Sequence, residues 1–255
     1  GVKGQVDAGL GKTLSSGTVT LIAPTDLISR DHETRVVDGV EIVFLMAPDS
    51  EAPAEMHMFY PAFKCLNMAE NAVHNFHNLL PFRGAEVRDS RAWSRYIDVA
   101  LMTFGDRAEA LIGQHHWPVW GTSVIKTYLA KQRDLYKYVH DQTLRLINHG
   151  HTPNEIAELL TLPDSLAHQW YARGYYGTVR HNAKAVYQKY LGWYDGNPAH
   201  LDSLPPREAA RKYVDYFGGF DAALTKAKAD FAKGEYRWVA EIANHLVFAD
   251  PANQE

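Results

Sequence analysis

The spacing of hydrophobic residues along the chain changes near residue 120. Before it, short β-rich segments alternate with helical stretches at 71–80 and 91–104, and the turn signal VDGV separates two of the strands. After it, every segment has helical spacing, and the first is a long amphipathic helix that ends at the sequence NHGH. The sequence therefore predicts an α/β half, residues 1–119, followed by an all-α half, residues 120–255.

The later helices have recognisable ends. Thr152 is a predicted N-cap with Pro153 in the first turn and Glu155 at the capping-box position. The last two helices, joined around Gly234, resemble a tetratricopeptide-type hairpin, although an ordinary helical hairpin explains the pattern as well. Because one such unit cannot bury both faces alone, we expect it to pack on its neighbours or on a second subunit.

Composition excludes several classes of protein. A hydrophobic content of 46% in 255 residues predicts a folded core, and a net charge of -4 argues against a nucleic-acid partner. The sequence has no run of about 18 apolar residues, so it predicts no transmembrane helix. The single Cys65 excludes an intrachain disulfide. The GLGKT sequence at 9–13 lacks the first glycine of a phosphate-binding loop, which indicates a flexible loop.

Two carboxylates and an imidazole follow predicted strands. Glu51 comes after EIVFLMA, Glu70 after FKCLNM, and His115, with His116 beside it, after EALIG. In α/β sheets the strand ends are where ligands bind, and Glu with His is a ligand set for zinc. A bridging carboxylate can hold two metal ions, so the pattern predicts a metal site if the three ends meet.

The helical stretch at 71–80 places His74, His77 and Asn78 on one face, opposite apolar residues. Histidine and asparagine on such a stripe are ordinary surface residues. We therefore interpret His74 and His77 first as a solvated helix face, and second as side chains that support nearby ligands.

Long stretches of the chain resemble the alkyl sulfatases of the metallo-β-lactamase superfamily. They are APAEMHMFYPAFKCLNMAENAVHNFHNLLPFRGAEVRD, GQHHWPVWG and RGYYGTVRHNAKAVYQKYLGWYDGNPAHL. The resemblance implies that residues 1–119 are the later part of a metallo-β-lactamase αββα sandwich that binds zinc. It also implies that residues 120–255 are a helical dimerisation domain, and hence a homodimer.

The resemblance further implies roles for individual residues. Glu51 matches a ligand of one of two zinc ions, Glu70 the ligand that bridges both, and His115 a ligand of the other, with His116 as the alternative. Asn78 and Arg83 match the positions that hold the sulfate group of an alkyl sulfate substrate. From the helical half, His181 and Tyr175 either approach the same sulfate or only pack between domains.

The family's remaining zinc ligands lie in a His-x-His-x-Asp-His motif, which this sequence does not contain. The resemblance implies that the chain begins just after that motif and stops before a sterol-carrier-like domain. Three interpretations remain open: a fragment, a subunit paired with a separate N-terminal chain carrying the motif, or a protein that has lost its own catalysis. A lone fragment is expected to bind zinc weakly.

The function that the resemblance implies is zinc-dependent hydrolysis of alkyl sulfate esters to alcohol and inorganic sulfate by a hydroxide that bridges the metals. Two alternatives remain: another hydrolase of the same fold, such as a phosphoesterase or lactonase, or a non-catalytic dimerisation module. Because family members that degrade detergents are often exported, we expect a periplasmic or secreted protein.

Overall fold

The computed structural model describes residues 17–253 and divides the chain into two compact units, residues 1–193 and 194–255. The GLGKT sequence at residues 9–13 lies outside the described residues. Among the helices of residues 17–253, none is long and apolar enough to cross a membrane.

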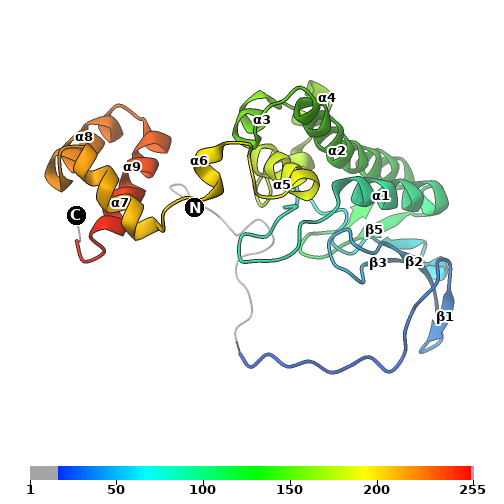
Figure 1. The fold of residues 1–255 in the computed structure, drawn as a ribbon. Helices are drawn as coiled ribbons and strands as arrows, with labels where there is room; N and C mark the ends of the chain where they lie inside the picture. The colour runs from blue at the N-terminus through cyan, green and yellow to red at the C-terminus, as the bar shows by residue number, and fades with distance from the viewer. Residues whose placement is uncertain (1–16, 254–255) are drawn as a thin grey trace. The chain divides into compact units, whose positions relative to one another are not determined.

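The first unit contains a six-stranded sheet in the described part of the chain, with the strands in chain order (Figure 1). All neighbouring strands are antiparallel except the fourth and fifth, which are parallel. The second, fourth and fifth strands therefore run in one direction and end at the same edge. The strands are β1 (Thr34–Val37), β2 (Val40–Met46), β3 (Met56–Tyr60), β4 (Cys65–Asn67), β5 (Ala110–Ile112) and β6 (Val119–Trp120).

The predicted VDGV turn is confirmed as the connection between β1 and β2. Asp38 and Gly39 both have positive φ, 50° and 79°, which is the backbone of a type I′ hairpin turn. Val37 pairs with Val40 directly across it.

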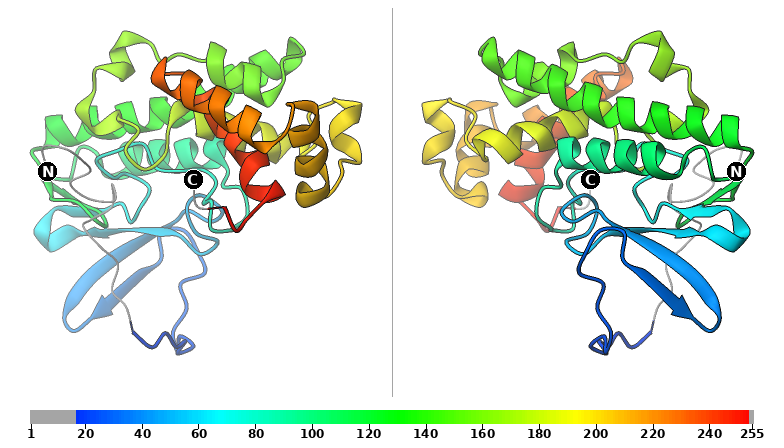
Figure 2. Two further views of the ribbon diagram at one scale, coloured as in Figure 1. Left: turned by 90° about the vertical axis from the view of Figure 1, so that its left-hand side faces the viewer. Right: turned by 90° about the vertical axis from the view of Figure 1, so that its right-hand side faces the viewer.

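Two helices cover the sheet in successive layers (Figures 1 and 2). They are α1 (Ser90–Phe104), which lies in the sequence between β4 and β5, and α2 (Thr122–Asn148). Both confirm predicted helices. Asp89 caps α1 by accepting a hydrogen bond from Ala92 N at 2.9 Å. Trp93 of α1 stacks on Tyr136 of α2 with ring centroids 4.6 Å apart, so the two layers share one buried core.

Three shorter helices complete the first unit. These are α3 (Pro153–Leu159), α4 (Asp164–Ala167) and α5 (Val179–Leu191), and 3-10 turns occupy Pro61–Phe63 and Trp170–Ala172. The predicted capping box is confirmed, since Thr152 and Glu155 each bond the other's backbone nitrogen. The observed structure is α/β followed by all-α, as the sequence predicts.

The predicted helix at 71–80 is wrong. The segment is irregular, and residues of both its expected faces are buried, among them Phe76 and His77. Its backbone groups bond to distant parts of the chain in place of a helical ladder: Phe76 N donates to Arg173 O, and Leu79 N to Asn182 Oδ1. Tertiary hydrogen bonds thus override a local helical pattern.

The β-rich sequence TVTLIAP at 18–24 is not a strand either. Its side chains are exposed, and β1 pairs only with β2 within the described sheet. Without a partner to complete a ladder, β propensity alone does not make a strand.

The second unit is helical. It contains α6 (Pro198–Leu201), α7 (Pro206–Tyr216), α8 (Phe220–Ala232) and α9 (Tyr236–Ala249), and α7 and α8 both pack against α9. The predicted hairpin around Gly234 is present, with Gly234 at φ 87° between α8 and α9. Its buried core is small and consists of Val214, Ala223, Ala227, Ile242 and Leu246.

The predicted division between residues 119 and 120 lies within β6, and the change from sheet to helix follows it at α2. The division between compact units lies instead between residues 193 and 194. The reason is that α2, α3 and α5 share the hydrophobic core of the sheet and α1.

Candidate metal and anion site

Three strand ends bring acidic and imidazole side chains to one edge of the sheet. Glu51 follows β2, Glu70 follows β4 and His115 follows β5, and these strands point the same way. His115 Nε2 lies 2.6 Å from Glu70 Oε1, although 45 residues separate them. The cause is the parallel pairing of β4 with β5, because it places both carboxyl ends at one edge.

Backbone strain collects at the same three places. Asp49, Ala69 and His115 have φ of 60°, 50° and 74°, in the left-handed region that residues other than glycine rarely adopt. Asp49 lies two residues before Glu51, Ala69 directly precedes Glu70, and His115 is itself a predicted ligand. Strain of this kind persists where the surroundings impose it, and it is frequent at functional sites.

The carboxylates of Glu51 and Glu70 also meet His77. One ligand atom from each of the three lies within 4.8 Å of the others, as a metal-binding group requires. His77 is 1% exposed, and His74 is buried among the rings of His116, Trp117, Tyr128 and Trp170. The interpretation of His74 and His77 as a solvated helix face is therefore wrong.

His77 presents a nitrogen that suits a cation. Arg88 Nη1 has two hydrogens, and its nearest acceptors are Asn78 Oδ1 at 2.6 Å and Asn78 O at 3.1 Å. Both hydrogens of Nη1 are therefore used, and the 3.2 Å contact between Nη1 and His77 Nδ1 is not a hydrogen bond. His77 Nδ1 lies 3.0 Å from Asn78 O, so Nδ1 carries the ring proton and donates it to that carbonyl. Nε2 is buried without a hydrogen-bond partner in the described structure, 3.6 Å from Glu70 Oε1. A lone pair facing a carboxylate fits a cation between them.

The carboxyl groups of this cluster differ in their pKa values. Burial opposes ionisation of Glu70, but the neighbouring imidazoles of His77 and His115 outweigh it and lower the pKa of Glu70 to about 2. Glu55, in the same loop as Glu51, is partly buried, and burial together with the charges of Glu51 and Glu70 raises its pKa to about 8. Glu55 is not among the residues predicted from the sequence. Mutual repulsion of this kind is relieved when a divalent cation binds.

A buried polar network joins the segments that carry Glu51 and Glu70. Asn71 Nδ2 donates to Ser50 Oγ at 3.1 Å, and Ser50 Oγ donates to Ala47 O at 2.6 Å. His57 Nε2 lies 2.8 Å from Asn71 Oδ1. Burial lowers the pKa of His57 to about 4, so the ring is neutral at pH 7 and donates to that oxygen. Because Ser50 and Asn71 directly adjoin the two glutamates, the network fixes their separation.

The adjacent residues His115 and His116 point to different partners. His115 Nε2 contacts Glu70, whereas His116 Nδ1 accepts a 3.3 Å hydrogen bond from His74 N and its ring stacks on the His74 ring. Of the two, His115 has the orientation of a ligand.

The residues predicted to hold sulfate lie beside the acidic cluster. Asn78 directly follows His77, and Arg88 contacts both Asn78 Oδ1 and Glu51 Oε1. Arg83 is exposed, and the Tyr176 hydroxyl and, less strongly, the charges of Glu51 and Glu70 raise its pKa. An exposed guanidinium next to fixed acidic ligands can bind an anion that also approaches a metal.

The two residues predicted from the helical half, His181 and Tyr175, form no hydrogen bond with Arg83 within residues 17–253. His181, near the start of α5, packs its ring edge-on against Phe82, with centroids 5.3 Å apart. Tyr175 is exposed, and its hydroxyl accepts from Arg173. The neighbouring Tyr176, which was not predicted from the sequence, accepts from Arg83 Nη1 at 3.4 Å and packs against His77.

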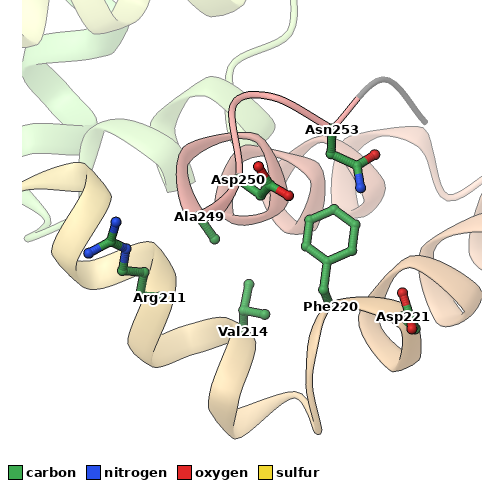
Figure 3. A pocket seen from close by; sticks show the side chains of 7 residues that line it. All are labelled: Arg211, Val214, Phe220, Asp221, Ala249, Asp250 and Asn253. Carbon is green, nitrogen blue, oxygen red and sulfur yellow. The ribbon is translucent and has the colours of Figure 1, made fainter.

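A separate cavity lies in the second unit, with a volume of about 400 Å³ (Figure 3). Its walls come from α7, α8 and the end of α9, and include Arg211, Val214, Phe220 and Asp250. None of the predicted ligand or sulfate-binding residues lines it.

Comparisons with known proteins agree with the resemblance. Residues 152–255 match the sequence family described as alkyl sulfatase dimerisation. The chain is 57% identical over 254 residues to the alkyl/aryl-sulfatase BDS1 of Saccharomyces cerevisiae and covers 39% of that protein. It is 52% identical over 252 residues to a linear primary-alkylsulfatase of a Pseudomonas species and covers 37% of it.

A solved structure has the same fold. The stereoselective inverting sec-alkylsulfatase Pisa1 from Pseudomonas sp. matches with a TM-score of 0.96 and 52% identity, over 99% of this chain and 40% of that one. The chain thus spans about two fifths of the length of the relatives it matches. Residues 152–255 therefore belong to the alkyl sulfatase dimerisation family, and the chain as a whole is similar in sequence and in fold to the matching part of known alkyl sulfatases.

Proposed function

We propose that the protein carrying this chain hydrolyses alkyl sulfate esters to an alcohol and inorganic sulfate at a zinc site. The observation that carries the proposal is the group of Glu51, Glu70 and His77 at the ends of β2 and β4, with Arg83 and Asn78 beside it. The names of the relatives support the sulfate ester as substrate.

Glu51, Glu70 and His115 are the ligands that we assign to two zinc ions, with Glu70 shared between them. His77, within reach of both glutamates, either joins as a ligand or holds Glu70 in place. The remaining ligands would come from a His-x-His-x-Asp-His segment. When bound, the zinc ions supply a water of lowered pKa as the nucleophile.

The residues of this chain then bind and orient the sulfate. Arg83 presents a permanently charged, planar donor, and Tyr176 contacts its guanidinium from the segment before α5. Asn78 adds an amide donor close to the acidic cluster. Fixed donors around the sulfate stabilise the charge that develops on its oxygens during hydrolysis.

The helical unit supports a homodimer. The dimerisation family covers residues 152–255, and α7, α8 and α9 expose large apolar side chains next to a small core. The exposed side chains include Tyr216, Phe231, Trp238 and Val247. A second copy of this unit is the partner that we assign to this surface.

Sulfate release from sodium dodecyl sulfate tests the function. The protein is supplied with zinc and with a polypeptide that carries the His-x-His-x-Asp-His segment. We expect Arg83→Ala to lower kcat/KM by about 100-fold, since a charge-assisted contact to the reacting group is lost. The control is Arg133→Ala, which breaks an ion pair with Asp98 between α2 and α1.

Two results would overturn the assignment. Faster turnover of a phosphate monoester or a lactone than of dodecyl sulfate would indicate a different hydrolase. A stable dimer that holds no zinc in excess metal would indicate a non-catalytic module.

A further inference from the structure

Arg88 is not marked by any sequence motif, yet it contacts both Glu51 and Asn78 in the candidate site. It precedes the N-cap of α1, and its backbone nitrogen donates to Leu79 O at 2.9 Å. Its side chain is only 11% exposed. A guanidinium held this firmly and desolvated to this extent needs partners that use its charge.

Its partners are one residue assigned to zinc and one assigned to sulfate. Nη2 forms an ion pair with Glu51 Oε1, and Nη1 donates to Asn78 Oδ1 at 2.6 Å and to Asn78 O at 3.1 Å. One rigid, planar group therefore joins a carboxylate assigned to zinc with an amide assigned to sulfate.

The chemistry of the two side chains decides how the Asn78 amide is turned. An asparagine amide has an acceptor oxygen on one side and two N–H donors on the other, and the two ends have nearly the same shape. Arginine has donors only, so it can pair with the amide oxygen and never with the NH2 group. Arg88 thus holds Oδ1 towards itself, and Nδ2 has no hydrogen-bond partner among residues 17–253.

Sulfate oxygens only accept hydrogen bonds, so an anion site needs Nδ2 rather than Oδ1 facing it. We propose that Arg88 is a positioning residue that locks Asn78 with its NH2 group directed at the sulfate, while its other nitrogen holds Glu51. The inference rests on the proposed function, because it deepens the role of the same anion site. Without Arg88, either end of the amide could face the sulfate, and Oδ1 would repel it.

Titration of inorganic sulfate into the 255-residue chain in saturating zinc tests the proposal, with affinities read by calorimetry. We expect Arg88→Met to weaken sulfate binding about 10-fold, the loss of roughly one charge-assisted hydrogen bond. Arg88→Lys, which also has donors only, should retain part of the affinity. Arg133→Met, which removes a guanidinium from α2, is the matched control and should bind sulfate normally.

A double-mutant cycle separates positioning from direct contact. If Arg88 acts through the amide, Arg88→Met should change sulfate affinity less than about twofold in an Asn78→Ala background, since the residue it orients is gone. Additive losses would show that Arg88 affects sulfate binding by a route other than Asn78, through direct contact or through Glu51, and they would overturn the proposed locking of the amide. Circular dichroism of each variant shows whether it is folded, so that a loss of affinity is compared only between folded proteins.

The sulfate titrations distinguish a wrong role for Arg88 from a wrong proposed function. No sulfate binding by the wild-type chain, or binding unaffected by Arg83→Ala, would contradict the anion site and the inference together. Sulfate binding that depends on Arg83 and Asn78 but not on Arg88 would overturn only the role of Arg88.

Discussion

Gly177 donates a backbone hydrogen bond to Phe76 O at 2.8 Å, and this bond joins the segment before α5 to the segment that carries His77. Phe76 N in turn donates to Arg173 O, so the two segments are paired over a short length. The pairing brings Tyr176 against both His77 and Arg83. A loop of the helical half therefore forms one wall of the candidate anion site.

Tyr176 and Tyr175 form a matched pair for mutation. Tyr176→Phe removes the hydroxyl that accepts from Arg83 Nη1, whereas Tyr175→Phe removes one that contacts Arg173. We expect the first variant to raise KM for dodecyl sulfate or Kd for sulfate about 3-fold, because one modest hydrogen bond on Arg83 is lost. The second should leave both constants unchanged. Equal effects of the two substitutions, measured by steady-state kinetics or calorimetry, would contradict the assignment of Tyr176.

Gly177 is required by close approach. A Cβ atom there would lie 2.4 Å from His77 O, which is backbone and cannot move aside cheaply. We predict that Gly177→Ala lowers the free energy of unfolding by about 1–3 kcal/mol and weakens sulfate binding by displacing Tyr176.

Gly150→Ala serves as the control, since φ is 82° there but no atom lies within 4 Å of the added Cβ. It should cost about 1–2 kcal/mol from the left-handed conformation alone, with sulfate affinity retained. Chemical denaturation checks both variants, and normal sulfate affinity in Gly177→Ala would argue against the wall described above.

His57 makes the stability depend on pH. Its pKa falls from 6.5 to about 4 on burial, so the unfolded chain binds more protons between those pH values and stability decreases as pH falls through that window. The full effect of this group is about 3 kcal/mol. His57→Gln removes the titration, and its free energy of unfolding should vary less between pH 6.5 and pH 4 than that of the wild type. Identical pH slopes in urea denaturation would contradict the buried, neutral His57.

The exposed apolar side chains of α7 and α9 predict how the proposed homodimer can be broken. Tyr216→Glu combined with Val247→Glu places charge on this surface and should weaken dimerisation at least about 10-fold. Lys226→Glu changes the charge of an exposed α8 residue away from Tyr216 and Val247 in sequence and is the control. Sedimentation equilibrium measures the dissociation constants. An unchanged dimer in the double variant would place the interface elsewhere, and a monomeric wild type would contradict the dimer itself.

Much of the fold follows from local pattern. The helices α1 and α2, the hairpin turn at Asp38 and Gly39, and the capping box at Thr152 follow from side chains that are near one another in sequence. The meeting of Glu70 with His115 was also predictable, because strand ends that share a sheet edge deliver their loops to one place.

The segment around His77 was not predictable in the same way. Its apolar residues have helical spacing, but Asn182 accepts from Leu79 N and donates to His77 O, across more than 100 residues. Such distant partners leave no local signal in the sequence. The choice between Tyr175 and Tyr176 likewise depends on which way a loop turns, and their shared sequence neighbourhood does not distinguish them.

Anomalous diffraction at the zinc edge, on crystals grown with zinc and the His-x-His-x-Asp-His polypeptide, shows whether Glu70 holds both metal ions. We predict two zinc peaks within about 2 Å of the Glu70 carboxylate oxygens, one also bonded to Glu51 and the other to His115. Zinc peaks only at other positions, with Glu70 bonded to none, would contradict this prediction.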